Sequence, residues 1–175
     1  MRKIIICIFL VLTFICSCSE KNKTASDWLE KEKALWDGKQ YTDPKKAIEY
    51  LNNAIKLQPN DAEPYLKRGN AYYKFGQYQL AIDDDSKAIT LKPDYADAYY
   101  NRGNAYVKLG QYQLAIEDYN KAISLKEDFT NAYANRAAIY LNQGNKELVC
   151  YDAQKACALG NCKILETAKV KGYCR

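Results

Sequence analysis

The sequence predicts an all-α protein built from antiparallel helix pairs that repeat along the chain. The segment 62–95 overlays the segment 96–129 with 22 identical positions out of 34 and no gap. Within each copy, apolar and small residues recur at steps of three and four residues, the spacing of one face of an α-helix. Glycine and proline are scarce, at 8 and 4 of 175 residues, which also suits helices. A period of 34 residues is typical of a solenoid of helix pairs.

Each copy is predicted to contain two helices joined by a short turn. Gly76 and Gly110 stand where the first helix ends, since glycine is the residue most often found just after a helix. Pro59 and Pro93 stand where the second helix ends, because the residue before a proline avoids the helical conformation. The residues expected to begin the next helices are Asp61 and Asp94 as N-caps, with Pro64 in a first turn.

Weaker copies flank the two clear ones. A divergent first repeat is expected at 26–61, with a longer turn and with Asp43 and Pro44 at the start of its second helix. A divergent last repeat is expected at 130–161, where Ala137 and Val149 replace two of the usual small residues. In order, the expected units are the repeats 26–61, 62–95, 96–129 and 130–161 and a cysteine-linked capping segment at 162–175.

This pattern resembles the tetratricopeptide repeat (TPR) family. Small residues stand where the helices of a pair approach closely, and tyrosines surround them. The small residues are Gly69, Ala81, Ala88, Gly103, Ala115 and Ala122, and the tyrosines are Tyr65, Tyr72, Tyr99, Tyr106, Tyr133 and Tyr140. These tyrosines are expected to fill the core or the contacts between repeats. The resemblance covers about 26–159 and implies a solenoid in which the first helices of successive repeats line a concave groove.

By the same resemblance, the concave groove is expected to bind a segment of a partner protein. The residues expected there are Asn70, Tyr73, Lys74, Tyr100, Asn101, Asn104, Lys108 and Asn135. Amide side chains can pair with the backbone of an extended peptide, tyrosines can pack on it, and the two lysines can meet an acidic group. A solvated groove without a strong peptide ligand is equally open, since asparagine at 70 and 104 is common in the family whatever the ligand.

The amino terminus is predicted to be a signal segment. Two basic residues precede an apolar run from Ile4 to Ile15, which is short for a membrane-spanning helix. The next residues resemble a bacterial lipobox and imply a signal peptide at 1–17, with lipid attached to Cys18. Residues 18–25 are then a flexible tether, and the outer membrane is favoured over the inner membrane because Ser19 follows the cysteine. An uncleaved hydrophobic anchor is the alternative.

Four cysteines lie in the last 26 residues, and disulfides are expected because an exported protein meets an oxidising compartment. A short helix returning over 163–171 favours pairing Cys150 with Cys174 and Cys157 with Cys162, among three connectivities. This helix is expected to cap the stack with Ile164, Leu165, Ala168 and Val170. A four-thiolate metal site and a redox pair are the weaker alternatives, since no two of these four cysteines are as close as C-x-x-C.

Composition argues against several function classes. The net charge of +5 comes from the two ends of the chain, and the segment between is neutral, so no nucleic-acid surface is indicated. Histidine is absent, which excludes Ser-His-Asp and Cys-His nucleophilic sites and histidine-ligated zinc. The acidic run Asp83-Asp84-Asp85 cannot converge on one point from consecutive helical positions, and only one of its residues is expected to face the partner helix. No enzyme activity, metal or cofactor is therefore expected.

The function predicted from the sequence is that of a non-catalytic interaction scaffold, tethered to the bacterial envelope and docking another envelope protein or peptide segment. Two alternatives remain open. One is a binder of cell-wall or glycan fragments, which the tyrosines and asparagines of the groove also suit. The other is a structural lipoprotein that self-associates into a homo-oligomer, since repeat stacks often continue across chain ends.

Overall fold

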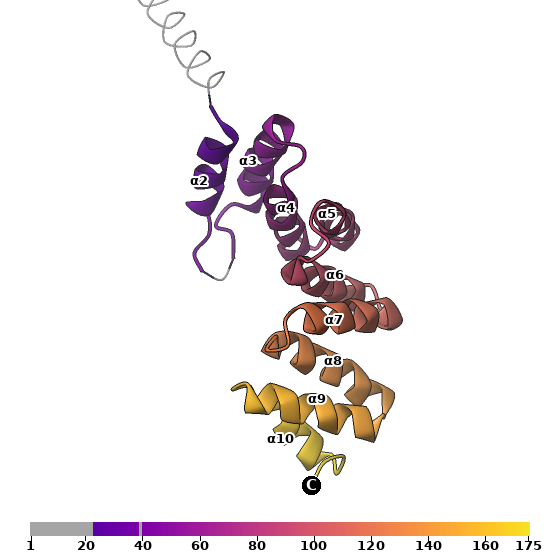
Figure 1. Ribbon diagram of the computed structural model, residues 1–175. Helices are drawn as coiled ribbons and strands as arrows, with labels where there is room; N and C mark the ends of the chain where they lie inside the picture. The colour runs from indigo at the N-terminus through magenta and orange to yellow at the C-terminus, as the bar shows by residue number, and fades with distance from the viewer. Residues whose placement is uncertain (1–22, 39) are drawn as a thin grey trace, which may run out of the picture. The chain divides into compact units, whose positions relative to one another are not determined.

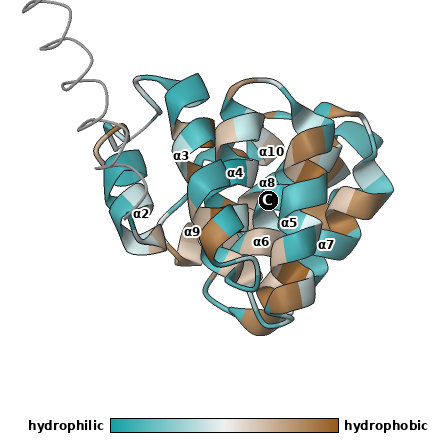
Figure 2. Cartoon of the chain, turned by 90° about the horizontal axis from the view of Figure 1, so that it is seen from above, coloured by the Kyte–Doolittle hydropathy of each residue, from teal (hydrophilic) through white to brown (hydrophobic). Residues whose placement is uncertain are grey.

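The computed structural model describes residues 23–38 and 40–175, and over these ranges it is all-α, with nine helices (α2 to α10) and no named strand (Figure 1). The predicted signal peptide and Cys18 lie outside the described residues. The chain divides into two compact units, one ending at Asn60 and one running from Asp61 to Arg175, which are described separately. In Figure 2, hydrophilic and hydrophobic residues alternate around the helices, as expected where one stripe of each helix is buried.

The first unit contains α2 (Ala25–Lys33) and α3 (Pro44–Leu57). Thr24 caps α2 through a capping box, in which its hydroxyl accepts from the backbone N–H of Asp27 and Asp27 accepts from the backbone N–H of Thr24. Ala25 is only 4% exposed and packs with Trp28 and Ala54. The last two residues of the expected tether thus take part in α2, since Thr24 is its N-cap and Ala25 its first residue.

The turn between α2 and α3 is long, as the extra residues of the first repeat predicted. An isolated antiparallel bridge joins Trp36 to Tyr41, and the Tyr41 hydroxyl donates a hydrogen bond to the buried carboxylate of Glu32. Asp43 then caps α3 by accepting from the backbone N–H of Lys46, with Pro44 in the first turn. The start of α3 at Asp43-Pro44 is thus confirmed.

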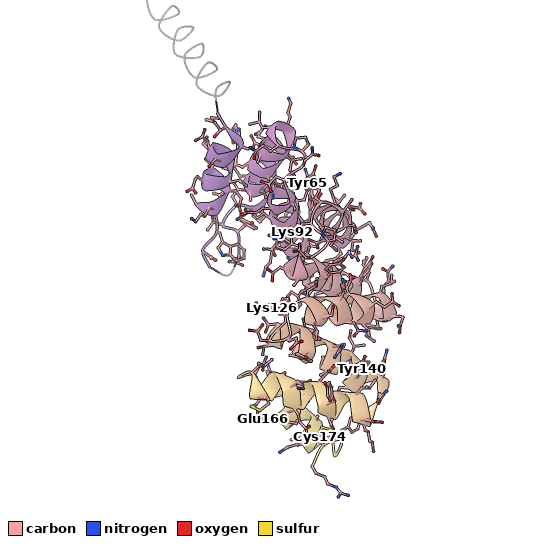
Figure 3. All side chains as sticks on the ribbon, in the orientation of Figure 1. Tyr65, Lys92, Lys126, Tyr140, Glu166 and Cys174 are labelled. Atoms are coloured by element: carbon pink, nitrogen blue, oxygen red, sulfur yellow. A yellow bond between two sulfur atoms is a disulfide. The ribbon has the colours of Figure 1, made fainter. Side chains whose placement is uncertain are left out.

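The second unit stacks three helix pairs. They are α4 (Ala62–Lys74) with α5 (Tyr78–Leu91), α6 (Ala96–Lys108) with α7 (Tyr112–Leu125), and α8 (Thr130–Gln143) with α9 (Lys146–Ala158). Asp61 caps α4 as expected. Asp94 does not cap α6, because that helix begins one residue later, with Tyr95 at its N-cap and no side-chain hydrogen bond. Lys92 and Lys126 occupy equivalent places in successive pairs, each over an aromatic ring (Figure 3).

Small residues bring the two helices of each pair together. Ala81, Ala88, Ala115 and Ala122 are fully buried. A Cβ added at Gly103 would lie 2.8 Å from Cε1 of Tyr119, so only glycine lets this ring pack against α6. In the preceding repeat, a Cβ at Gly69 would lie 2.7 Å from Oδ1 of Asp85, the residue that takes the place of Tyr119. The family's small-residue sites are therefore close helix contacts in this chain.

A chain of arginine–aspartate pairs runs through the second unit. Arg68, Arg102 and Arg136 stand at the same position of successive repeats, and each makes two hydrogen bonds of 2.7–2.8 Å to an aspartate 16 residues further on. These acceptors are Asp84, Asp118 and Asp152 respectively. The guanidinium of Arg102 also donates to Ser86 of the preceding second helix at 3.0 Å, and Arg136 donates likewise to Asn120. One side chain thus joins three helices.

Tyrosines flank these arginines. The guanidinium of Arg68 lies 5.6 and 5.8 Å from the ring centres of Tyr65 and Tyr72, and that of Arg102 lies 5.7 and 5.9 Å from those of Tyr99 and Tyr106. These distances allow cation–π attraction. These tyrosines fill space between repeats, as expected, and they also shield the ion pairs from water.

The C-terminal helix α10 (Lys163–Val170) closes the stack and contacts both α8 and α9. Cys150 is bonded to Cys174 and Cys157 to Cys162, with Cα–Cα distances of 5.5 and 3.9 Å. Ala168 and Cys174 are buried with Leu141 and Val149, and Ile164 and Leu165 pack against them. Cys174 is labelled in Figure 3. Val170 is not part of this cap, because 89% of its surface is exposed.

The arginine–aspartate chain can be tested at its middle pair. Replacing Arg102 by methionine leaves the Asp118 carboxylate buried without its counter-ion, and we expect a loss of roughly 3–5 kcal/mol in the free energy of unfolding. Adding Asp118→Leu to the same chain should recover most of that loss, since an apolar pair needs no counter-ion. Denaturant unfolding followed by circular dichroism measures both variants. If Arg102→Met alone were as stable as the parent protein, the pair would not be what holds these helices together.

Candidate functional site

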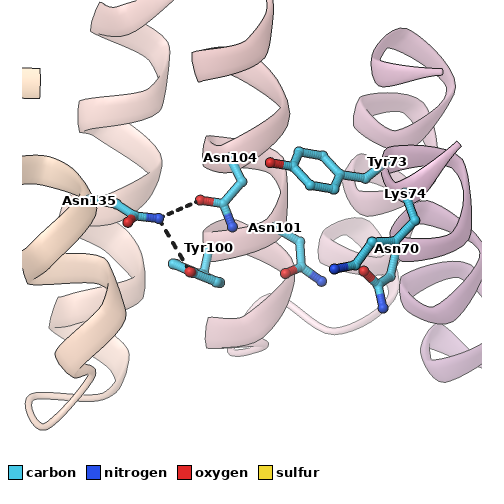
Figure 4. Close-up of a pocket in the computed structure, with 7 residues that line it drawn as sticks. All are labelled: Asn70, Tyr73, Lys74, Tyr100, Asn101, Asn104 and Asn135. Atoms are coloured by element: carbon cyan, nitrogen blue, oxygen red, sulfur yellow. Dashed lines mark hydrogen bonds between the residues drawn. The ribbon is translucent and has the colours of Figure 1, made fainter. Parts of the chain in front are cut away.

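The first helices of the three pairs in the second unit, α4, α6 and α8, share one face, and a cavity of about 310 Å³ lies on it. The residues that line it are Asn70, Tyr73, Lys74, Tyr100, Asn101, Asn104 and Asn135. They come together because they recur at helical steps on each first helix and at equivalent places in successive repeats. Figure 4 shows their side chains reaching into the same space from three helices.

Two of the asparagines are held by hydrogen bonds within the protein. The carbonyl oxygen of the Asn104 side chain accepts from the Tyr119 hydroxyl at 2.7 Å and from the Asn135 amide at 2.8 Å. The Asn135 amide also donates to the Tyr100 hydroxyl at 3.2 Å (Figure 4). Burial raises the pKa of Tyr119 well above its usual range, so its hydroxyl stays protonated and remains a donor. Asn104 and Asn135 therefore have fewer groups to offer a ligand than the sequence suggested.

At the other end of the cavity, the polar side chains are not hydrogen-bonded to one another. No side-chain hydrogen bond or ion pair within the described residues involves Asn70, Asn101 or Lys74. Tyr73 stands beside them with its ring 5.5 Å from that of Tyr78, and burial raises the pKa of its hydroxyl. Together these side chains offer amide donors and acceptors, a phenol and an ammonium group to whatever enters.

Two further cavities continue the first along the same helices. One, of about 250 Å³, shares Tyr73, Asn104 and Asn135 with the first and adds Lys108, with other residues of α6, α7 and α8. The other, of about 330 Å³, lies between α8 and α10 and shares Asn135. Its polar lining from the C-terminal segment is Asn161, Lys163 and Thr167. The three cavities form one continuous groove, named here the concave groove.

The structure thus assembles every groove residue expected from the sequence, with Lys108 in the second cavity and the other seven in the first. Sequence reasoning missed Tyr119 and the contribution of α10. Tyr119 could have been noticed, because it stands opposite Gly103 and at the place of Asp85 in the register. The approach of α10 to this face had no signal in the sequence, since the cysteine pairing does not say on which side the helix returns.

Beneath the groove, the acidic run differs from expectation. Asp83 is exposed, but Asp84 and Asp85 both face inward, so two residues rather than one are buried. Asp84 pairs with Arg68, whereas Asp85 is 1% exposed and its Oδ1 has no hydrogen-bond partner. Burial, with Asp84 and Asp118 nearby, raises the pKa of Asp85 well above its ordinary value, although Arg102 opposes the shift. A proton on Asp85 is the simplest way to bury it beside Gly69.

Over residues 23–38 and 40–175, no group of three or more histidine, cysteine or acidic side chains is arranged to hold a metal ion. No helix in this part of the chain is long and apolar enough to cross a membrane. What the described residues do provide is a polar groove with aromatic walls, which suits binding better than bond-making chemistry.

Comparisons with known proteins agree with this geometry. Family models described as the tetratricopeptide repeat and the TPR repeat match residues 96–129 and residues 45–76 and 69–110. A crystal structure of MamA superposes with a TM-score of 0.74 at 31% sequence identity, covering 91% of this chain and 86% of that one. The chain belongs to the tetratricopeptide repeat family.

Other TPR structures are similar over shorter stretches. The TPR domain of Arabidopsis OM64 gives a TM-score of 0.64 at 28% identity, covering 68% of this TPR protein and 96% of that domain. The first TPR domain of Spaghetti (RPAP3), solved with an HSP90 peptide bound, gives 0.64 at 23% identity, covering 70% and 94%. That second likeness shows the fold alone. No protein with a curated description matches the chain.

The buried carboxyl of Asp85 makes the stability of this TPR protein depend on pH. The pKa of Asp85 is raised in the folded protein. Its stabilising contribution to the free energy of unfolding is therefore fully present below pH of about 4, and it is lost as the pH rises through the folded pKa. Asp85→Asn should therefore stabilise the protein at pH 7, with a gain that disappears near pH 4. Thermal unfolding at pH 4, 5.5 and 7 measures the effect. The exposed Asp83→Asn on the same helix is the control, and an equal pH profile for both variants would contradict the assignment.

Proposed function

We propose that this TPR protein is a non-catalytic scaffold of the bacterial envelope, tethered through lipid on Cys18, that holds a segment of a partner protein in its concave groove. The observation that carries the proposal is the open end of the first cavity, where Asn70, Asn101 and Lys74 have no hydrogen-bond or ion-pair partner within the described residues. Polar groups left free inside a concave site are available to a ligand's backbone and side chains.

Membership of the TPR family also supports binding of a partner protein. TPR folds are typical of protein–protein interaction, and the Spaghetti domain was solved holding a peptide. In this chain, amide groups and tyrosine rings line a groove that runs across α4, α6 and α8. An extended polypeptide matches such a groove, because amides pair with its backbone and rings pack on its side chains.

The partner can be sought with a photo-crosslinking residue placed at Asn142 or at Gln154 in intact native cells. Both positions are exposed amides, but Asn142 lines the groove and Gln154 lies on α9 outside the three cavities of the groove. We expect one or two proteins to be crosslinked from Asn142 and not from Gln154. Asn70→Ala together with Asn101→Ala should reduce that yield several-fold, because these amides contact the partner and make no side-chain hydrogen bond of their own in the described fold.

The outcomes separate the competing functions. Crosslinks from Asn142 to other copies of this chain alone would favour the self-associating lipoprotein, and crosslinks to no protein would favour a ligand such as a wall fragment. Equal crosslinking from both positions would contradict the groove as the docking site. Mass spectrometry of the crosslinked species distinguishes these results.

The tether is tested by Cys18→Ala. Loss of the acceptor thiol should leave the protein unlabelled by radioactive palmitate and move it from the membrane pellet to the soluble fraction, since lipid chains supply the anchoring. Cys16→Ala is the matched control, because that thiol lies within the lipobox, two residues before Cys18, but is not the expected acceptor. A parent chain that takes up no palmitate, and that pellets as completely as Cys18→Ala, would argue for the uncleaved hydrophobic anchor instead.

A further inference from the structure

The charges that line the concave groove all have one sign. Each of its three cavities contains one lysine, which is Lys74 in the first, Lys108 in the second and Lys163 in the third. None of the three cavities is lined by an aspartate or glutamate. The three ammonium groups make no ion pair within the described residues, and all three lysines are exposed. The charged side chains that line the groove are therefore all positive and have no ion-pair partner in the described part of the chain.

The cations that line the groove are lysines and not arginines, because the arginines of α4, α6 and α8 are paired with aspartates. Arg68, Arg102 and Arg136 are each paired with a buried aspartate, and none of them lines a cavity of the groove. No guanidinium is left to grip a carboxylate with two hydrogen bonds. Lysines are point charges on flexible stems, so they suit a ligand whose negative charges are spread out rather than gathered at one end.

The neutral groups of the groove differ between its two ends. Near Lys108, the amides of Asn104 and Asn135 are partly taken up with Tyr119 and Tyr100. In the preceding repeat, Asp85 stands where Tyr119 would stand, and the amide of Asn70 is left without a partner in the described fold. The Asn101 amide of α6 also lines the cavity beside Lys74 and makes no hydrogen bond there. Free amides therefore stand beside Lys74, whereas further along the groove Asn142, Asn161 and Thr167 are the polar groups that accompany Lys108 and Lys163.

We propose that the concave groove takes an internal acidic segment of an extended polypeptide, with carboxylates meeting Lys74, Lys108 and Lys163 in turn, and that no free C-terminal carboxylate is needed. This inference rests on the proposed function and narrows it to one partner chemistry. Packed helices lie roughly 8–10 Å apart and an extended chain rises about 3.3 Å per residue, so roughly three residues cross each helix. Because α8 carries no lysine of the groove, the acidic residues that match Lys74, Lys108 and Lys163 are about three and then about six residues apart, within a segment of about ten residues.

The probe is a fluorescent ten-residue peptide, acetylated at its N-terminus and amidated at its C-terminus, with three glutamates spaced to match Lys74, Lys108 and Lys163 and with serine, alanine and tyrosine between. Three matched peptides accompany it. In one the glutamates are glutamines, in another they are lysines, and in the third the glutamines are kept and the C-terminal carboxylate is free. Fluorescence anisotropy with the folded, disulfide-bonded protein is measured at 20 and 300 mM salt.

We expect the glutamate peptide to bind more tightly than the other three, with affinity that falls as salt rises because exposed charge pairs are screened. Lys74→Gln and Lys108→Gln should each weaken binding roughly two- to fivefold, the range of an exposed ion pair, and together roughly tenfold. Lys87→Gln with Lys121→Gln is the control. These two lysines are also exposed and one repeat apart, but they lie on the second helices α5 and α7 and line no cavity of the groove, so they should leave binding unchanged.

Failure of this inference is distinct from failure of the proposed function. Equal binding of the glutamate and glutamine peptides, still reduced by Asn70→Ala with Asn101→Ala, would overturn the acidic segment and leave a peptide groove in place. Preference for the free carboxylate would overturn the internal segment. Equal loss in the control variant would show a non-specific charge effect, which also overturns it. Binding of none of the peptides, together with no crosslink from Asn142, would remove both proposals.

Discussion

In two of the three repeats of the second unit, one guanidinium joins three helices. Arg102 lies on α6, bonds twice to Asp118 of α7 and once to Ser86 of α5, and Arg136 repeats the pattern one pair further on. Burying such a pair gains little over an apolar pair of equal size, so its main effect is on geometry. A planar donor with several N–H groups fixes the angle and register of the helices it joins. The regular spacing of α4, α6 and α8, on which the groove depends, follows from that constraint.

The same constraint decides what the groove contains. Because the arginines of the first helices are turned toward their aspartates, the groove receives lysines, amides and tyrosines from the other face of those helices. One substitution between repeats then distinguishes Asn104 from its equivalent Asn70. Tyr119 engages Asn104, while Asp85 at the equivalent place lies beneath the groove beside Gly69 and engages neither Asn70 nor Asn101. Two repeats with 22 identical residues out of 34 therefore present different surfaces.

Much of the candidate site follows from the repeat itself. Once the period of 34 and the helical steps are known, Asn70, Asn101 and Asn104 must share a face, and Lys74 and Lys108 must stand at equivalent places on it. What could not be read from spacing is which of these groups are already engaged. That depends on contacts between residues far apart in the sequence, such as Asn135 with Tyr100 and Asn104. The approach of α10 to α8, which brings Lys163 to the groove, also could not be read from the spacing of residues in the sequence.

The sequence alone determined the helix pairs, their order and the face that each first helix turns to the groove, because these follow from local periodicity and from a repeat that copies it. It also favoured the nested cysteine pairing, because a short return helix leaves little choice of distance. Tertiary structure decided the arginine–aspartate chain, the burial of Asp85 and the division of the amides into engaged and free. These depend on which side chains meet across helices. Two residues with the same sequence neighbours can therefore differ, as Asn104 with its two hydrogen bonds differs from Asn70 with none in the described fold.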